Sequence, residues 1–428
     1  MNDRTHSAPP DHPQRLSLAN EIHARPPEPL ASPERASYIA LAIDRDQRER
    51  EHGHLALLCE RFGAPPPPAG VSHWSARLGD LRLKWERHTE FTGYGFYVHG
   101  PGGFESPAVA HLPDGWLAAI PGRTIAAAHT LVIPDVGESS YAACLARWFP
   151  GGTVVGSEIS NGAGVAFTDF RIGEDGYERF VLLDRRLLPT QAGRVSKRLF
   201  EIEAYRVMAL LALPLAQEQA PKIGQIEQSL AALTEQIAHG RGGDEAMLVE
   251  LSELAAKVEN AIDAIQYRIS ASTAYYDLVR SRIVELQEGR IAGLQTIEEF
   301  MTRRLAPAMS TVASVAQRLR DLSERVARAS GLLSTRVEIA REKQNQTLLE
   351  SMERRARLQL RLQETVEGLS IAAITYYMAG LVGYLAKGAH AAGIAVDPEI
   401  AVAVSIPFIA GLVALGLARV RRHIGTAH

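Results

Sequence analysis

The chain has 428 residues, which exceeds one ordinary domain and favours a soluble head joined to a helical region. Its net charge of −3 excludes a protein whose whole surface is basic, so we expect no nucleic-acid partner. The two cysteines, Cys59 and Cys144, lie far apart without metal-like spacing, which indicates a reducing compartment and no disulfide framework. The N-terminus lacks the apolar core of a secretory signal, so we expect the head to stay in the cytoplasm.

Residues 1–15 are polar and contain proline, which predicts disorder. The following stretch, residues 16–27, mixes ionisable and apolar side chains and ends in two prolines that no helix continues through. Ser32-Pro33 is typical of a helix start, with serine as N-cap and proline in the first turn. We therefore predict a helix from there to Phe62, where Gly63 and a proline run end it.

From Leu81 onward apolar and charged residues alternate, which is the pattern of a half-buried strand. A second β-rich run covers residues 91–98, and a hairpin turn is expected near residues 88–90. Further strands are predicted at residues 130–133, 153–159, 165–172 and 180–183, with a helix at 139–148 between them. Residues 16–188 are thus predicted to form an α+β cytoplasmic head with a largely antiparallel sheet.

Residues 189–366 have a helical pattern throughout. One helix is predicted to end at Pro214, and another at the glycine-rich stretch 240–243. Two heptad seams follow, one from Leu248 to Leu286 and one from Val312 to Leu333, separated by a break around residues 289–307. They predict long antiparallel coiled-coil helices that form a stalk, and the pattern does not decide between association within one chain and association of several chains.

Two apolar runs near the C-terminus predict a transmembrane hairpin. The first span covers residues 367–387, and about 19 uncharged residues suffice to cross the hydrocarbon. Residues 388–399 form a short connector, 400–418 the second span and 419–428 a tail. Basic residues flank both spans on the same side: Arg354, Arg355, Arg357, Arg361, Arg419, Arg421 and Arg422. The positive-inside rule then predicts a multi-pass protein of a bacterial inner membrane with both termini cytoplasmic and the connector periplasmic, rather than a buried hairpin of a soluble protein.

The first span carries small and hydroxyl-bearing residues. Gly380 and Gly383 permit close approach of a second helix. The hydroxyl groups are expected either to bond a neighbouring helix or to line a pore; they belong to Ser370, Thr375, Tyr377 and Tyr384. No charged residue lies deep in either span, which argues against a proton relay or a transporter of charged substrates.

No motif in the head specifies an enzyme or a cofactor. Glu86, His88 and Glu90 occupy alternate positions, and together with Glu21, His23 and Arg25 they are the candidates for a ligand or metal site. The competing interpretation is a polar strand face followed by a turn, because the alternation of a strand alone explains the spacing of these residues. The peptide around residues 20–25 is either part of that site or a strap docked through Leu16, Leu18 and Ile22.

Four long segments resemble a bacterial family of uncharacterised membrane proteins, the domain of unknown function 3422 family. They are LANEIHARP (residues 18–26), KWERHTEF (84–91), FMTRRLAPA (300–308) and QNQTLLESMERRARLQLRLQETVEGLS (344–370). The resemblance covers nearly the whole chain. It implies a cytoplasmic N-terminal region and a C-terminal membrane anchor, without an established activity.

The architecture is also loosely similar to CorA-type magnesium channels, which join an α/β head to long helices and two spans. Their Gly-Met-Asn signature is absent here, because the corresponding end reads Gly383-Tyr384-Leu385-Ala386-Lys387. The leading hypothesis is an oligomeric, membrane-anchored scaffold or sensor without enzymatic activity. The alternative is a CorA-like ion channel with the first span lining the pore, and a third is an enzyme that uses Glu21, His23 and His88.

Overall fold

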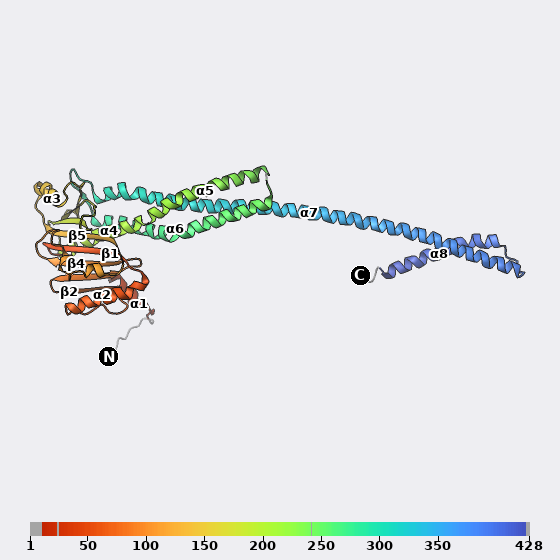
Figure 1. Ribbon diagram of the computed structural model, residues 1–428, viewed down its shortest axis with the longest axis horizontal. Helices are drawn as coiled ribbons and strands as arrows, with labels where there is room; N and C mark the ends of the chain where they lie inside the picture. Colours follow the sequence, from red (N-terminus) through yellow and green to blue (C-terminus); the bar gives the residue numbers. More distant parts are fainter. Residues whose placement is uncertain (1–10, 24, 241, 425–428) are drawn as a thin grey trace, which may run out of the picture. The chain divides into compact units, whose positions relative to one another are not determined.

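The structure is a computed structural model that describes residues 11–23, 25–240 and 242–424. It divides into two compact units, Met1–Ser330 and Gly331–His428. The first unit contains an N-terminal α/β domain and long helices, and the second contains two apolar helical segments (Figure 1). Residues 1–10, on which part of the predicted disorder falls, lie outside the described residues.

Within the described residues the head is built on one nine-stranded mixed sheet of order β2-β3-β4-β1-β5-β8-β7-β6-β9. The strands are β1 (Glu34–Ala42), β2 (His73–Leu78), β3 (Leu81–Arg87), β4 (Thr92–His99), β5 (Arg123–Pro134), β6 (Val155–Ile159), β7 (Gly164–Thr168), β8 (Glu178–Asp184) and β9 (Gly289–Arg290). The pairing of β5 with β8 is parallel, whereas the other described pairings are antiparallel, as predicted for most of the sheet.

The helices are α1 (Arg15–His23), α2 (Arg48–Arg61), α3 (Tyr141–Trp148), α4 (Pro189–Leu210), α5 (Ala212–His239), α6 (Asp244–Leu286), α7 (Ile297–Ala391) and α8 (Pro398–Ile424). Helix α4 begins with Pro189, whose fixed φ suits the first turn, and the Gln191 side chain accepts a hydrogen bond from the Leu188 N–H. Helix α5 ends at Gly240, which adopts the left-handed conformation that glycine tolerates best.

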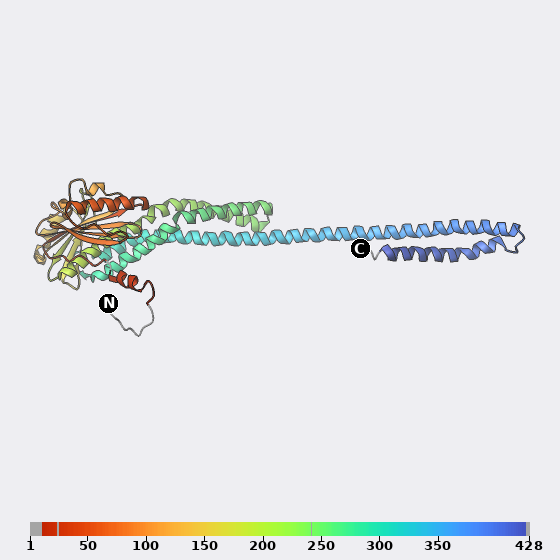
Figure 2. The ribbon, with the colours of Figure 1, turned by 90° about the horizontal axis from the view of Figure 1, so that it is seen from below.

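Helices cover both faces of the sheet. On one face α4, the end of α6 and the start of α7 bury a core that includes Phe180, Leu199 and Met301. On the opposite face α2 covers a second core around Trp85 and Phe96, and Figure 2 shows α2 and these long helices on opposite sides of the sheet. A third core lies under α3. The alternation predicted from Leu81 is confirmed, because Leu83 and Trp85 point to α2 and the intervening polar residues point to α4.

The helix predicted from Ser32 to Phe62 is wrong in its first half. Residues 34–42 form β1, a central strand between β4 and β5, and helix α2 begins only at Arg48. Pairing on both edges and burial on both faces outweigh the local helix-start signal. Strand β2 was not predicted either, whereas β5 to β8 and α3 lie where strands and a helix were expected.

The long helices of the first unit pack through apolar residues that include the whole of the predicted second seam but only part of the first, because Leu248, Ala255 and Ile262 are half-buried. Helix α4 ends at Leu210, four residues before the predicted stop at Pro214, and Pro214 itself stands in the first turn of α5, where no hydrogen bond is lost. The whole second seam is buried, from Val312 to Leu333, and Arg318 of α7 pairs with Glu227 of α5 at 2.7 Å. Along α6 the buried residues are Met247, Leu251, Leu254, Val258, Ala261, Ile265, Ser272, Val279, Ile283 and Leu286.

Candidate functional site

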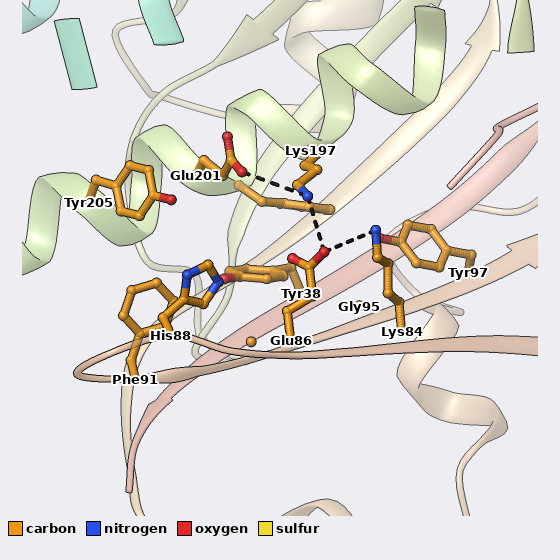
Figure 3. A pocket seen from close by; sticks show the side chains of 12 residues that line it. Tyr38, Lys84, Glu86, His88, Phe91, Gly95, Tyr97, Lys197, Glu201 and Tyr205 are labelled. Carbon is orange, nitrogen blue, oxygen red and sulfur yellow. Dashed lines mark hydrogen bonds and ion pairs between the residues drawn. The ribbon is translucent and has the colours of Figure 1, made fainter. Parts of the chain in front are cut away.

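The candidate site is a small cavity between the sheet and α4 (Figure 3). Its volume is about 20 Å³, which is room for a single water molecule. Strands β1, β3 and β4, the turn after β3 and helix α4 supply its walls. The polar and aromatic residues that line it are Tyr38, Lys84, Glu86, His88, Phe91, Tyr97, Lys197, Glu201 and Tyr205.

Local geometry explains why these side chains converge. Lys84 and Glu86 lie two residues apart in β3 and therefore share a face. Lys197, Glu201 and Tyr205 follow one another at four-residue steps along one face of α4.

Two glycines of β4 make room for the phenol rings. A Cβ at Gly93 would lie 2.7 Å from the Tyr38 hydroxyl, and one at Gly95 would lie 2.5 Å from the Tyr97 hydroxyl. The rings of Tyr38 and Tyr97 are able to lie over the β4 backbone because Gly93 and Gly95 have no side chains.

Glu86 lies between two ammonium groups. Its Oε1 is 3.0 Å from Lys84 Nζ and 3.1 Å from Lys197 Nζ. Burial acts to raise the pKa of Glu86, but Lys197 and Lys84 outweigh it and lower that pKa below its usual value. Burial also lowers the pKa of Lys84. The network continues through Glu201, which binds Arg282 of α6 at 2.5 Å, so it joins the sheet to two helices.

His88 closes one side of the cavity. Its ring stacks on Phe91, with centroids 4.3 Å apart and an interplanar angle of 18°. Burial lowers the pKa of His88 to about 4, and the positive charges of Arg25 and Lys197 act in the same direction. The imidazole is therefore neutral at pH 7 and has one donor and one acceptor nitrogen.

A peptide strap, residues 25–30, lies against this network. Lys197 Nζ donates to the carbonyl of Arg25 at 2.9 Å, and Lys84 Nζ donates to the carbonyl of Pro26. Arg82 binds Glu28 at 2.8 Å and the carbonyl of Pro29 at 2.9 Å. Prolines at positions 26, 27 and 29 have no N–H to satisfy, and the carbonyl groups of Arg25 and Pro26 serve as acceptors for the two lysines.

The strap predicted around residues 20–25 differs from the observed one, because residues 15–23 form helix α1 and the strap begins only at Arg25. Leu16 and Leu18, the apolar residues predicted to dock it, are 74% and 61% exposed, and the side chain of Ile22 lies outside the description. The strap is held by its carbonyl groups and by Glu28 instead, because proline-rich backbone is a ready acceptor for buried cations.

The predicted site residues separate into two groups. Glu86 and His88 line the same cavity, and Arg25 lies next to His88 in the adjoining cleft. Glu90 lines the same cleft but not the cavity. It faces α6, where both of its oxygens accept from Arg268 at 2.9 Å and Tyr267 donates to it at 3.0 Å. The side chains of Glu21 and His23 are not among those described. Within the part of the chain that is described, no cluster of three or more His, Cys, Asp or Glu residues is suited to a metal ion.

Comparison with known proteins places the chain in a family. A family model described as "Protein of unknown function (DUF3422)" matches residues 10–424. The chain belongs to the DUF3422 family. No curated protein and no solved structure matches it, so the looser likeness to CorA-type channels is not supported.

Two of the four segments that carry the DUF3422 resemblance meet at the site. The end of residues 18–26 forms the start of the strap, and residues 84–91 supply Lys84, Glu86 and His88. A third segment, residues 300–308, belongs to the first turns of α7, where Phe300 stacks on Phe170 of the head.

Lys197, Glu201 and the cavity tyrosines were not predicted for this DUF3422 site. The available signal was the four-residue spacing of Lys197, Glu201 and Tyr205 along α4. That spacing predicts that the three residues share one face of the helix, but it does not predict which strand the face packs against.

In the second unit, two helices are long and apolar enough to cross a membrane. Thr375, Ala379 and Ala386 are buried, and a Cβ at Gly383 would lie 3.0 Å from a methyl group of Val402 in α8. Gly380, Tyr377 and Tyr384 are exposed, and Ser370 is half-buried. The basic flanks Arg354, Arg355, Arg357, Arg361 and Arg419 are exposed, whereas the side chains of Arg421 and Arg422 lie outside the description.

Proposed function

We propose that this DUF3422 protein is a membrane-anchored cytoplasmic scaffold or sensor, in which the α/β head and coiled-coil stalk associate with further copies of the chain. The observation that carries this proposal is helix α7, a single element of 95 residues. Its first turns bury Ile297, Met301 and Leu305 in the core of the head, and its last part contains one of the two apolar runs. The same helix thus contributes to both units, which favours a role that couples the head to the anchor.

An uncovered face of α7 supports association. Between Leu333 and Thr375 no described side chain is buried. Between Leu348 and Leu369, at 100° per residue, the large exposed apolar side chains occupy one broad side, interrupted by Arg355 and Glu367, and the other charged residues occupy the opposite side. The apolar residues are Leu348, Leu349, Met352, Leu358, Leu360, Leu362, Val366 and Leu369. A second copy of the same helix would cover this face as a coiled coil.

The proposed orientation follows from charge. The arginines before the first apolar run and after the second favour an inner-membrane hairpin with both termini in the cytoplasm. Reporter fusions at Gly393 and after His428 test this: we expect a periplasmic reporter to be active only at Gly393. Activity of the C-terminal fusion alone would reject the orientation. Release of the protein by alkaline carbonate without detergent would reject the anchor.

Disulfide cross-linking in native membranes tests association. In a background with Cys59→Ala and Cys144→Ser, Leu348→Cys lies on the apolar side of α7 and Glu350→Cys lies about 200° away on the charged side. Parallel copies bring identical seam positions together, so we expect Leu348→Cys to give a dimer band and Glu350→Cys to give little. Equal cross-linking of both variants, or of neither, would contradict the proposed interface.

A stripe of hydroxyl-bearing residues on the first apolar run supports a second candidate function, that of an ion channel. Ser370, Tyr377 and Tyr384 recur at seven-residue steps, on the side of the helix opposite to the buried Thr375 and Ala379. Hydroxyl groups facing hydrocarbon are unfavourable, so they favour either a neighbouring copy or a water-filled path. Ion flux into liposomes that contain the purified oligomer distinguishes the two: association without flux supports the scaffold or sensor.

A further inference from the structure

An open cleft of about 760 Å³ lies beside the small cavity and shares His88, Phe91 and Tyr205 with it. Its volume falls within the range of about 300–1,000 Å³ that small-molecule sites occupy. The turn after β3, the strap residue Arg25, helix α4 and one face of α6 line it. We call it the arginine–tyrosine cleft.

Helix α6 creates the hollow by a change of side-chain size. Tyr267, Ala271, Ala274, Tyr275 and Leu278 all line the cleft, and their spacing puts them on one side of the helix. The two alanines stand between the tyrosines, so the aromatic wall has a gap at its centre.

The remaining wall is aromatic. Phe91 contacts Tyr205 edge-on with centroids 6.2 Å apart, and Tyr205 lies 5.6 Å from Tyr275. His88 extends this group by stacking on Phe91. Aromatic faces and edges of this kind bind planar rings favourably.

The charges of the cleft favour an anion. Glu90 is the acidic residue among the lining side chains, and Arg268 neutralises it through two hydrogen bonds of 2.9 Å. Arg25 and Arg87 also line the cleft. Arg87 Nη2 lies 3.8 Å from Glu51 of α2, whereas Arg87 Nε has no hydrogen-bond partner within the described structure. A buried donor without a partner is costly, and an anionic ligand would satisfy it.

The backbone of Arg25 is strained. Its φ is 60°, a left-handed conformation that residues other than glycine rarely adopt and that costs on the order of 1 kcal/mol. The Lys197 bond to its carbonyl holds this conformation, and the guanidinium donates to Ser72 at 3.1 Å at the edge of the cleft. Strain of this kind concentrates at functional sites.

We propose that the arginine–tyrosine cleft binds a small ligand that combines a planar ring with an anionic group. The ring packs between the alanines and tyrosines of α6 and the aromatic side chains of the turn, and the anionic group lies toward Arg25 and Arg87. Such a ligand would touch the turn, the strap, α4 and α6 at once. The biological meaning of this inference rests on the proposed sensor role, but binding itself does not depend on the membrane topology or on the α7 interface.

Calorimetry on the purified full chain in nanodiscs tests the proposal. The probes are adenosine monophosphate, flavin mononucleotide and indole-3-acetate, with adenosine and inorganic phosphate as controls that lack the anion or the ring. We expect at least one planar anion to bind with a Kd below about 1 mM and both controls to bind at least about tenfold more weakly.

Variants locate the binding. Ala274→Leu fills the centre of the cleft, whereas Ala256→Leu makes the same change at another exposed position of α6. We expect Ala274→Leu to weaken binding at least about tenfold and Ala256→Leu to leave it within about twofold. Arg25→Gln should weaken the binding of the planar anions and leave the binding of adenosine unchanged. The proposal is overturned if no planar anion binds, if adenosine binds equally well, or if Ala274→Leu binds like wild type. Cross-linking of α7 is unaffected by any of these results, so the two proposals fail separately.

Discussion

Two buried carboxyl groups of the head share one arginine. Arg206 Nη2 lies 2.6 Å from Glu178 Oε1 and 2.6 Å from Glu203 Oε1, and both glutamates are almost fully buried. One guanidinium cannot neutralise two carboxylates. Burial, with the negative charge of Glu203 adding to it, raises the pKa of Glu178 to about 9. Glu178 is therefore protonated in the folded head at neutral pH.

This raised pKa makes the head less stable as pH rises. The unfolded chain loses the Glu178 proton near its ordinary pKa of 4.5, whereas the folded state keeps it to about pH 9. Stability should thus fall with increasing pH between these values. Glu178→Gln copies the protonated form, so we predict a flatter dependence of the unfolding midpoint between pH 6 and 9, measured by thermal unfolding. The exposed Glu218→Gln is the control, and an equal effect of both variants would refute the assignment.

At the scale of single residues, the sequence predicted only one side of the cavity. Glu86 and His88 were visible because alternation in a strand identifies residues of one face. Lys197 and Glu201 were not, because they come from a region interpreted as stalk. Their role depends on the position of α4 over β3, which is a long-range contact that helix spacing cannot predict.

At the scale of the elements, the close packing of the strap against α4 depends on a glycine of that helix. A Cβ at Gly193 would lie 1.9 Å from the carbonyl oxygen of Glu28 and 2.9 Å from its carbon. This obstacle is backbone, so it cannot rotate away. The strap is able to approach α4 only because this helical position has no side chain.

We predict that Gly193→Ala displaces the strap. A Gly→Ala change inside a helix normally stabilises by about 0.5–1 kcal/mol, but here the clash with Glu28 should cancel that gain and lower stability. The Leu30 N–H, which bonds to the Pro189 carbonyl at 2.9 Å, should exchange its hydrogen faster. Hydrogen exchange with mass spectrometry measures this. Gly53→Ala in α2 is the matched control, since nothing lies within 4 Å of its Cβ, and it should stabilise. Wild-type exchange in Gly193→Ala would show that the strap does not need this glycine.

The elements that were predicted well are those with a one-sided pattern. Strand β3 alternates because one face meets α2 and the other is polar. Strand β1 is buried on both faces, so its sequence has no alternation, and its Glu, Arg and Ala residues suit a helix by propensity. Pairing with β4 and β5 decides its structure, and both partners are distant in the sequence.

At the scale of the whole molecule, the burial pattern of α7 changes along its length. From Met309 to Leu333 the apolar residues of the heptad seam are buried, whereas Leu332 outside the seam is 72% exposed. Contacts such as Arg318 with Glu227 and Ser272 with Met309 join this part of α7 to α5 and α6. After Leu333 the described side chains are not buried again until Thr375. The heptad pattern predicted which residues face a partner, but it could not tell which helix the partner is, because identical spacing suits an internal and an external contact.

This division predicts how the chain responds to truncation. A fragment of residues 1–340 keeps the part of α7 that is buried between Ile297 and Leu333 and lacks both apolar runs, so we expect it to fold cooperatively and to stay in solution without detergent. A fragment of residues 1–308 removes the seam from Met309 to Leu333 and leaves apolar residues of α5 and α6, such as Leu230 and Val258, without their cover. Exposed apolar surface of this size drives aggregation, so the shorter fragment should precipitate or lose cooperative unfolding. Size-exclusion chromatography and thermal unfolding of the two fragments measure the difference. If the 1–340 fragment also needs detergent, the affinity for detergent does not arise from the apolar runs, and the head itself must contain an exposed apolar surface.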